Sequence, residues 1–273
     1  MTNPNASQVE RAIDAARDRG RGAFIGYLPA GFPDLDTSVE AAVALARNGV
    51  DVIEFGVPYS DPVMDGPVIQ AACNTALQHG FKVAQLFEAI RRVRERTDVP
   101  VLVMSYYNLI MQHGVERFAA DLAAAGGAGA ITPDLIPEEA GEWIEAADRH
   151  GLDRVFLASS TSSDERLRSV IEHSRGFVYT VSTLGTTGAR AELDAAAKVL
   201  ADRLHGFGCE RACVGIGIST AAQIGDVLDY AEGAIVGSAL VRSLAESGLD
   251  GLAETAGALA AGKLDSPIRG AHL

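Results

Sequence analysis

Short runs of consecutive apolar residues recur along the chain and alternate with segments of helical periodicity, such as residues 39–47, 86–96 and 117–125. A polar or glycine- and proline-rich loop follows each apolar run. Because these runs are continuously apolar rather than alternating, they are typical of strands buried on both faces, as in a parallel sheet. The predicted strands are residues 23–28, 52–55, 101–104, 129–132, 155–158, 177–181, 212–216 and 234–237.

Eight strand–helix units in 273 residues average about 34 residues each, which predicts an α/β fold that is a single (β/α)8 TIM barrel. A doubly wound sheet would carry a glycine fingerprint after its first strand, whereas here that strand leads into the proline-containing loop of residues 27–33. An extra N-terminal helix is predicted over residues 7–19, where it would close the bottom of the barrel. No linker divides the chain, so residues 1–273 are expected to form one domain with a loose tail after about residue 262.

The composition narrows the classes of function. A hydrophobic share of 48% allows a large core, and a net charge of −13 argues against nucleic acid and anionic membrane surfaces as partners. The sequence has no apolar run of membrane-spanning length and no signal-peptide core near its start. The three cysteines, Cys73, Cys209 and Cys213, are too few for a disulfide framework or a zinc site. We therefore expect a cytoplasmic, reduced protein that binds neither membrane nor nucleic acid.

Residues 51–67 are the most informative stretch. Glu54 lies near the end of an apolar run, and the turn-rich loop that follows holds Asp61 and Asp65. An unpaired carboxylate in an apolar setting costs several kcal/mol, so this placement is favoured where a strand end opens into a cavity. The alternative is a glutamate on an edge strand that faces water, with the two aspartates capping turns.

Three glycine-containing loops follow the last three predicted strands, at residues 185–188, 215–219 and 237–240. In barrels of this kind the loops after strands seven and eight often hold phosphate, because backbone N–H groups can approach an anion closely at glycine. Each loop alone is more often plain turn chemistry, but three neighbouring loops predict a phosphorylated substrate. The third glycine of a dinucleotide motif is missing, which argues against NAD.

Lysine and histidine are absent from the predicted strand ends, so the sequence favours neither a Schiff base nor a metal site. Carboxylates and tyrosines remain there: Glu54, Asp65, Tyr106 or Tyr107, and Tyr179. This set suits general acid–base catalysis without a cofactor or metal. The lysines are Lys82, Lys198 and Lys263, and the histidines are His79, His113, His150, His173, His205 and His272.

The motif at residues 54–67 resembles the signature of the tryptophan synthase α subunit family, and further motifs follow in family order up to residue 240. The resemblance implies cleavage of indole-3-glycerol phosphate to indole and glyceraldehyde 3-phosphate, in tryptophan biosynthesis. It also implies an αββα complex in which indole passes through a tunnel to a β subunit that carries pyridoxal phosphate. The supporting motifs are residues 27–33, 106–108, 133–139, 179–182, 185–188, 215–219 and 236–240.

The resemblance also implies roles for individual residues. Glu54 would transfer protons at indole C3 and at the glycerol hydroxyl, and Asp65 would hydrogen-bond the indole N–H. A retro-aldol cleavage needs an electron sink, and the indole ring itself provides one once C3 is protonated. The other substrate-binding residues would be Tyr27, Tyr106, Tyr179, Gly188, Gly217, Gly237 and Ser238. The partner interface would contain Pro58, Tyr59, Asp61, Pro62 and Asn108, with exposed tyrosine and proline side chains.

Two residues depart from the commoner family pattern, Thr186 and Ile136, and they bear on loop closure and partner contact rather than on the catalytic groups. Three other interpretations stay open. A stand-alone indole-3-glycerol-phosphate lyase would use the same site but release free indole. A sugar-phosphate epimerase or isomerase barrel would need the missing histidine cluster or lysine. An inactive paralogue that serves only as a binding subunit would not need to retain Glu54 and Asp65.

Overall fold

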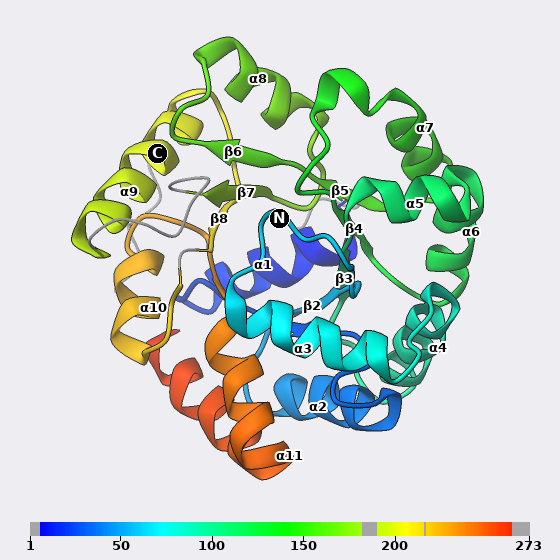
Figure 1. The fold of residues 1–273 in the computed structure, drawn as a ribbon. Coiled ribbons are helices and arrows are strands. Elements are labelled where there is room, and N and C mark those ends of the chain that lie inside the picture. The colour runs from blue at the N-terminus through cyan, green and yellow to red at the C-terminus, as the bar shows by residue number, and fades with distance from the viewer. Residues whose placement is uncertain (1–5, 182–189, 216, 264–273) are drawn as a thin grey trace.

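A barrel of parallel strands wrapped by helices forms the protein in the computed structural model, which describes residues 6–181, 190–215 and 217–263 (Figure 1). Neighbouring strands pair in the order β5-β4-β3-β2-β1-β9-β8-β7-β6, and every pair is parallel. The strands are β1 (Ala23–Pro29), β2 (Val52–Gly56), β3 (Val101–Met104), β4 (Gly129–Ile131), β5 (Asp153–Val155), β6 (Leu157–Ser159), β7 (Val178–Val181), β8 (Ala212–Val214) and β9 (Gly233–Val236).

The TIM barrel is confirmed, with one correction to the expected eight strands. The predicted fifth strand, residues 155–158, is two short strands, β5 and β6, which are separated by Phe156. β5 pairs with β4, whereas β6 pairs with β7. The Phe156 carbonyl accepts a hydrogen bond from the Tyr179 amide (3.0 Å), so the same stretch of chain joins both ends of the sheet. The ring therefore closes at this interrupted strand.

Most helices lie outside the strands, and none of those in the described ranges is long and apolar enough to cross a membrane (Figure 1). The helices are α1 (Gln8–Asp18), α2 (Leu35–Arg47), α3 (Pro67–Gln78), α4 (Val83–Arg94), α5 (Tyr107–His113), α6 (Val115–Ala124), α7 (Gly141–Arg149), α8 (Asp164–His173), α9 (Arg190–Gly206), α10 (Ala221–Leu228) and α11 (Ser238–Ala260), with short 3₁₀ turns at Pro137–Glu139 and Ala261–Lys263.

Helix α1 closes one end of the barrel, as the sequence predicts. A capping box starts it: the Ser7 hydroxyl accepts from the Glu10 amide, and the Glu10 carboxylate accepts from the Ser7 amide. Its apolar side packs into the barrel interior, where the core cluster also contains residues from β1, β2, β3 and β8. The buried residues of α1 are Val9, Ile13 and Ala16.

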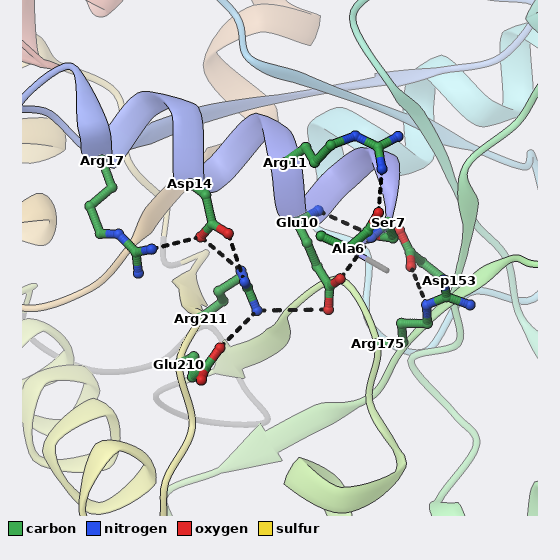
Figure 2. A network of polar contacts seen from close by, with 10 residues as sticks. All are labelled: Ala6, Ser7, Glu10, Arg11, Asp14, Arg17, Asp153, Arg175, Glu210 and Arg211. Atoms are coloured by element: carbon green, nitrogen blue, oxygen red, sulfur yellow. Dashed lines mark hydrogen bonds and ion pairs between the residues drawn. The ribbon is translucent and has the colours of Figure 1, made fainter. Parts of the chain in front are cut away.

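Ion pairs surround this apolar contact and tie α1 to the barrel (Figure 2). Arg211, which comes just before β8, reaches Asp14 (2.8 Å) and Glu10 (3.7 Å) of α1. On the other side, Arg175 lies 3.6 Å from the fully buried Asp153 at the start of β5. Burial raises the pKa of Asp153 to about 6, against the opposing effects of the Ser7 hydroxyl and Arg175.

The chain stays folded through Lys263, one residue beyond the point where a loose tail is expected. Lys263 is only 4% exposed, and its ammonium donates to the Gly49 carbonyl (2.5 Å) and to Asp51 (2.7 Å). Asp51 also accepts from the Phe24 amide (2.9 Å), so this buried pair holds Lys263 beside β1. Residues 264–273 lie outside the described part of the chain.

The packing of α1 predicts that Ile13→Ala destabilises the protein by about 2–5 kcal/mol, the usual cost of a large cavity in a core. Ile13 is 1% exposed within the barrel plug. The free energy of unfolding from urea titration measures the effect. Val199→Ala is a matched control, because Val199 is 61% exposed and its truncation should change stability by less than about 0.5 kcal/mol. Equal effects of the two substitutions would mean that α1 contributes no core packing.

Candidate functional site

Glu54 points into the barrel near the carboxyl end of β2. Strand side chains alternate between faces, so Glu54 shares the inner face with Val52, which belongs to the interior cluster. The side chain is fully buried, and neither carboxylate oxygen has a hydrogen-bond partner among the described residues. Burial, and secondarily the charge of Asp65, raises the pKa of Glu54 to about 8. Glu54 therefore holds a proton at neutral pH.

Asp65 lies on the loop that connects β2 to α3. Its carboxylate is 3.5 Å from the Tyr106 hydroxyl, and the same hydroxyl accepts a hydrogen bond from the Met64 amide (2.9 Å). Burial raises the pKa of Asp65, but the Tyr106 hydrogen bond favours the ionised form and opposes this effect. Asp65 is less buried than Glu54, so the two carboxyl groups have different environments.

Two tyrosines face this pair from β1 and β7. Tyr27 is the register partner of Glu54, and a Cβ atom on Gly56 would lie only 2.1 Å from the Tyr27 hydroxyl. In the same way, a Cβ atom on Gly215 would lie 2.5 Å from the Tyr179 hydroxyl. Burial raises the pKa of both tyrosines well above the ordinary value, and the charge of Glu54 adds to this. Glycine is thus needed at the end of β2 and directly after β8 to admit two neutral phenols.

Helix α11 starts beside these tyrosines. Its N-cap is Gly237, and a Cβ atom there would touch the Tyr27 ring at 3.4 Å. The first amides of a helix have no partner within the helix, so the Ser238 end of α11 can bind an anion. Gly217, after β8, has a φ of +60°, which favours glycine. Gly188 lies outside the described residues.

Comparison with known proteins gives one consistent result. The family described as "Tryptophan synthase alpha chain" matches residues 13–263. A tryptophan synthase alpha chain of Leifsonia xyli is 59% identical over 256 residues, which cover 94% of this chain and 98% of the relative. The corresponding chain of Mycobacterium avium is 48% identical over 257 residues, or 94% of each chain.

Solved structures agree. A chain of Mycobacterium tuberculosis tryptophan synthase superposes with a TM-score of 0.90 and 47% identity, covering 94% of this chain and 98% of that one. Tryptophan synthase subunit alpha of Legionella pneumophila, at 29% identity, still gives a TM-score of 0.86 over 94% of this chain and 98% of its own. The chain belongs to the tryptophan synthase alpha chain family.

The structure brings together most of the residues that the family motif singles out. Glu54, Asp65, Tyr27 and Tyr179 influence one another electrostatically, and Tyr106 hydrogen-bonds Asp65. The five histidines that the structure describes contact backbone carbonyls or carboxylates away from this group, and no cluster in the described ranges is arranged to hold a metal. These histidines and their partners are His79 with Pro33, His113 with Asp121, His150 with Glu116, His173 with Ser169, and His205 with Glu232.

The residues expected at the partner interface of an alpha chain lie on the loop after β2, except Asn108, which lies in the first turn of α5. Asn108 is exposed, and its amide donates to the Tyr59 hydroxyl (3.3 Å). Asp61 is exposed, whereas Tyr59 and Pro62 are half-buried. The expectation of exposed prolines is wrong for Pro58, which is buried just after the end of β2.

Cys73 on α3 lies beside the site residues Tyr27 and Asp65, although nothing in its sequence context indicates a role there. The Tyr27 hydroxyl, the Tyr59 backbone and Asp65 are all close enough to the thiol to influence its pKa. Burial raises the pKa of the thiol to about 12, so it stays neutral. Helical spacing places Cys73 beside Ala72 and Ala76 on the buried side of α3. That pattern could have indicated burial, but not proximity to Asp65.

The electrostatics predict that Asp65→Asn lowers the pKa of Glu54, because the substitution removes a negative charge that disfavours ionisation. Burial is the larger cause and remains, so the pKa should stay above the ordinary value of 4.5. The titration of the Glu54 carboxyl carbon in ¹³C-labelled protein measures this, with Glu54→Gln used to assign the signal. An unchanged or raised pKa in the Asn variant would contradict the proposed proximity of the two acids.

Proposed function

We propose that Glu54 and Asp65 carry the carbon–carbon lyase reaction of the tryptophan synthase alpha chain, the cleavage of indole-3-glycerol phosphate to indole and glyceraldehyde 3-phosphate. One observation supports this assignment above the others. Glu54 is a fully buried carboxyl group that has no hydrogen-bond partner in the described structure and keeps its proton at neutral pH. A general acid needs a pKa close to the working pH, and Glu54 has one.

The reaction follows from the protonated state of Glu54 and the ionised state of Asp65. Protonated Glu54 gives its proton to indole C3, and the ring becomes a cation whose N–H faces the Asp65 carboxylate. The charge of Asp65 stabilises this cation more than the neutral substrate, which lowers the barrier. Glu54, now ionised, removes the proton from the glycerol hydroxyl next to C3. The C–C bond breaks, the hydroxyl carbon becomes the aldehyde, and the bonding electrons return to the indole ring.

The remaining site residues bind and orient the substrate in this proposal. The hydroxyls of Tyr27 and Tyr179 stay neutral, so they bring no charge to the reacting end of the site beside Glu54. The phosphate would bind at the start of α11, where Gly237 and Ser238 present backbone amides beside Tyr27. Gly217 and Gly188 would complete this anion site. The indole ring is the electron sink, so these steps draw on no cofactor in this chain.

We further propose that the chain works with a tryptophan synthase β subunit, which would carry pyridoxal phosphate and receive the indole. Two apolar side chains near the expected interface residues support a docking surface: Val63 is 78% exposed and Met111 is 54% exposed. They lie on the loop after β2 and on α5, the segments that also hold Tyr59 and Asn108. Exposed apolar groups beside a polar rim are typical of protein interfaces.

Glu54→Gln should lower kcat for indole release by about 10²–10⁴, the usual contribution of a positioned general acid. Glutamine has nearly the shape of the protonated acid, so the fold should be retained. Glu40→Gln is the control, since Glu40 pairs with Arg96 at the surface and should leave kcat unchanged. Near-parent turnover of the Glu54 variant would remove Glu54 from the mechanism.

Thermal unfolding gives the same substitution a readout that is independent of activity. The folded pKa of Glu54 is raised, so the unfolded chain loses this proton at lower pH than the folded one, and stability falls as pH rises from 4.5 through about 8. The Glu54→Gln variant has no ionisable group at this position, so it lacks this pH-dependent loss of stability. Its melting temperature relative to the parent should therefore increase between pH 5 and pH 9.

Titration of the β subunit separates the two-subunit enzyme from a stand-alone lyase. Partner docking on the loop after β2 should order Asp65 and raise lyase kcat. By linkage, glycerol phosphate bound at the α11 end should tighten the complex by the same factor as the partner tightens glycerol phosphate. The affinity measured with and without glycerol phosphate tests this. Identical affinities together with an unchanged lyase rate would favour the stand-alone enzyme.

A further inference from the structure

We propose that Tyr59 is a positioning residue for the lyase reaction: it holds the Tyr106 ring in place, and Tyr106 in turn holds Asp65. This inference rests on the proposed function, because it concerns the geometry of the same site. It adds a role to a residue that the family motif places only at the partner interface. The role belongs to the chain itself and does not need a bound partner.

Two separate contacts fix Tyr59. Its ring packs against the Tyr106 ring, with centroids 5.1 Å apart and planes tilted by 35°. Its hydroxyl accepts a hydrogen bond from the Asn108 amide on α5 (3.3 Å). Tyr59 is thereby tied to α5 and to Tyr106, the residue that caps α5.

Tyr106 connects this arrangement to the reacting groups. Its hydroxyl accepts from the Met64 amide (2.9 Å) and has one proton to donate, which faces the Asp65 carboxylate (3.5 Å). Among the described side chains, Tyr106 is the one that hydrogen-bonds the Asp65 carboxylate, whereas the Gln70 amide donates to the Asp65 backbone carbonyl (2.7 Å). Tyr106 is the N-cap of α5, and the Tyr59 ring packs on it from the loop after β2, so Tyr59 helps to keep the Tyr106 hydroxyl beside Met64 and Asp65.

Loss of the Tyr59 ring should change the pKa of Asp65, which a loss of stability alone would not do. If Tyr106 moves, Asp65 loses the hydrogen bond that favours its ionised form, so the pKa of Asp65 rises. The reaction needs Asp65 ionised, and the acid limb of the kcat profile then moves to higher pH. The titratable groups that face Asp65 come from β1, β2, β7, α3 and the loop before α5, and they are Tyr27, Glu54, Tyr179, Cys73 and Tyr106.

The test compares Tyr59→Leu with Tyr59→Phe in the full chain, without a partner and with the β subunit. Leucine removes the ring, and we expect kcat to fall by about ten- to hundredfold, the range that follows from misplacing a reacting group by about 1 Å. KM should stay within about twofold, because the phosphate end is untouched. Phenylalanine keeps the ring and loses only the Asn108 hydrogen bond, so it should restore kcat to within about threefold of the parent.

The pH profile and a remote control decide the interpretation. We expect Tyr59→Leu to shift the acid limb of kcat to higher pH, while Tyr230→Phe, which removes a hydroxyl from a buried tyrosine between α10 and β9, leaves it in place. An unshifted limb with parent-like kcat in the isolated Leu variant would overturn the proposal, even if partner binding were weakened. If Tyr59→Leu does not fold, a loss of kcat well beyond threefold in the Phe variant, with its acid limb unmoved, would overturn the proposal as well. Absence of lyase turnover in the parent chain would instead refute the proposed function.

Discussion

The site depends on the burial of one carboxyl group. Glu54 lies fully inside the barrel, where an ionised carboxylate without partners would cost several kcal/mol. The group avoids that cost by keeping its proton, which is why its pKa rises to about 8. The same constraint makes Glu54 a usable acid at neutral pH. Its environment has to stay free of positive charge, because a neighbouring cation would lower the pKa of Glu54 and cause the carboxyl group to lose its proton.

The two ends of the barrel are built from different chemistry. At the end closed by α1, cations and carboxylates pair: Arg211 with Asp14, and the buried Lys263 with Asp51. At the other end, the groups around Glu54 are phenols, a thiol, glycines and a single further carboxylate. Ion pairs can therefore hold the closed end together without changing the protonation of the reacting end. This division agrees with the general rule that barrels carry stability at the bottom and chemistry at the top.

Features of the fold and site that are encoded by neighbouring residues could be predicted from the sequence, whereas those that depend on contacts between distant residues could not. Continuous apolar runs predicted the strands, and the misplaced Glu54 predicted the site, because both are local patterns. The break at Phe156 was not visible, since an unbroken apolar run does not show where a strand changes its hydrogen-bonding partner. Lys263 contacts Gly49 across 214 positions, and Cys73 looks like any small residue on a buried helix side. Such contacts follow from tertiary packing rather than from spacing.

Tyrosine is the side chain that best suits a site with two acids of different charge. Aromatic residues make up only 6% of the chain, and six of them are tyrosines. Four of these lie at the site: Tyr27, Tyr59, Tyr106 and Tyr179. A phenol can donate a hydrogen bond to ionised Asp65 while remaining neutral beside protonated Glu54. A lysine or protonated histidine in the same place would stabilise both carboxylates in their ionised form and remove the proton that indole C3 must receive. Neutral donors thus allow one acid to be charged and its neighbour to stay protonated within the same small volume.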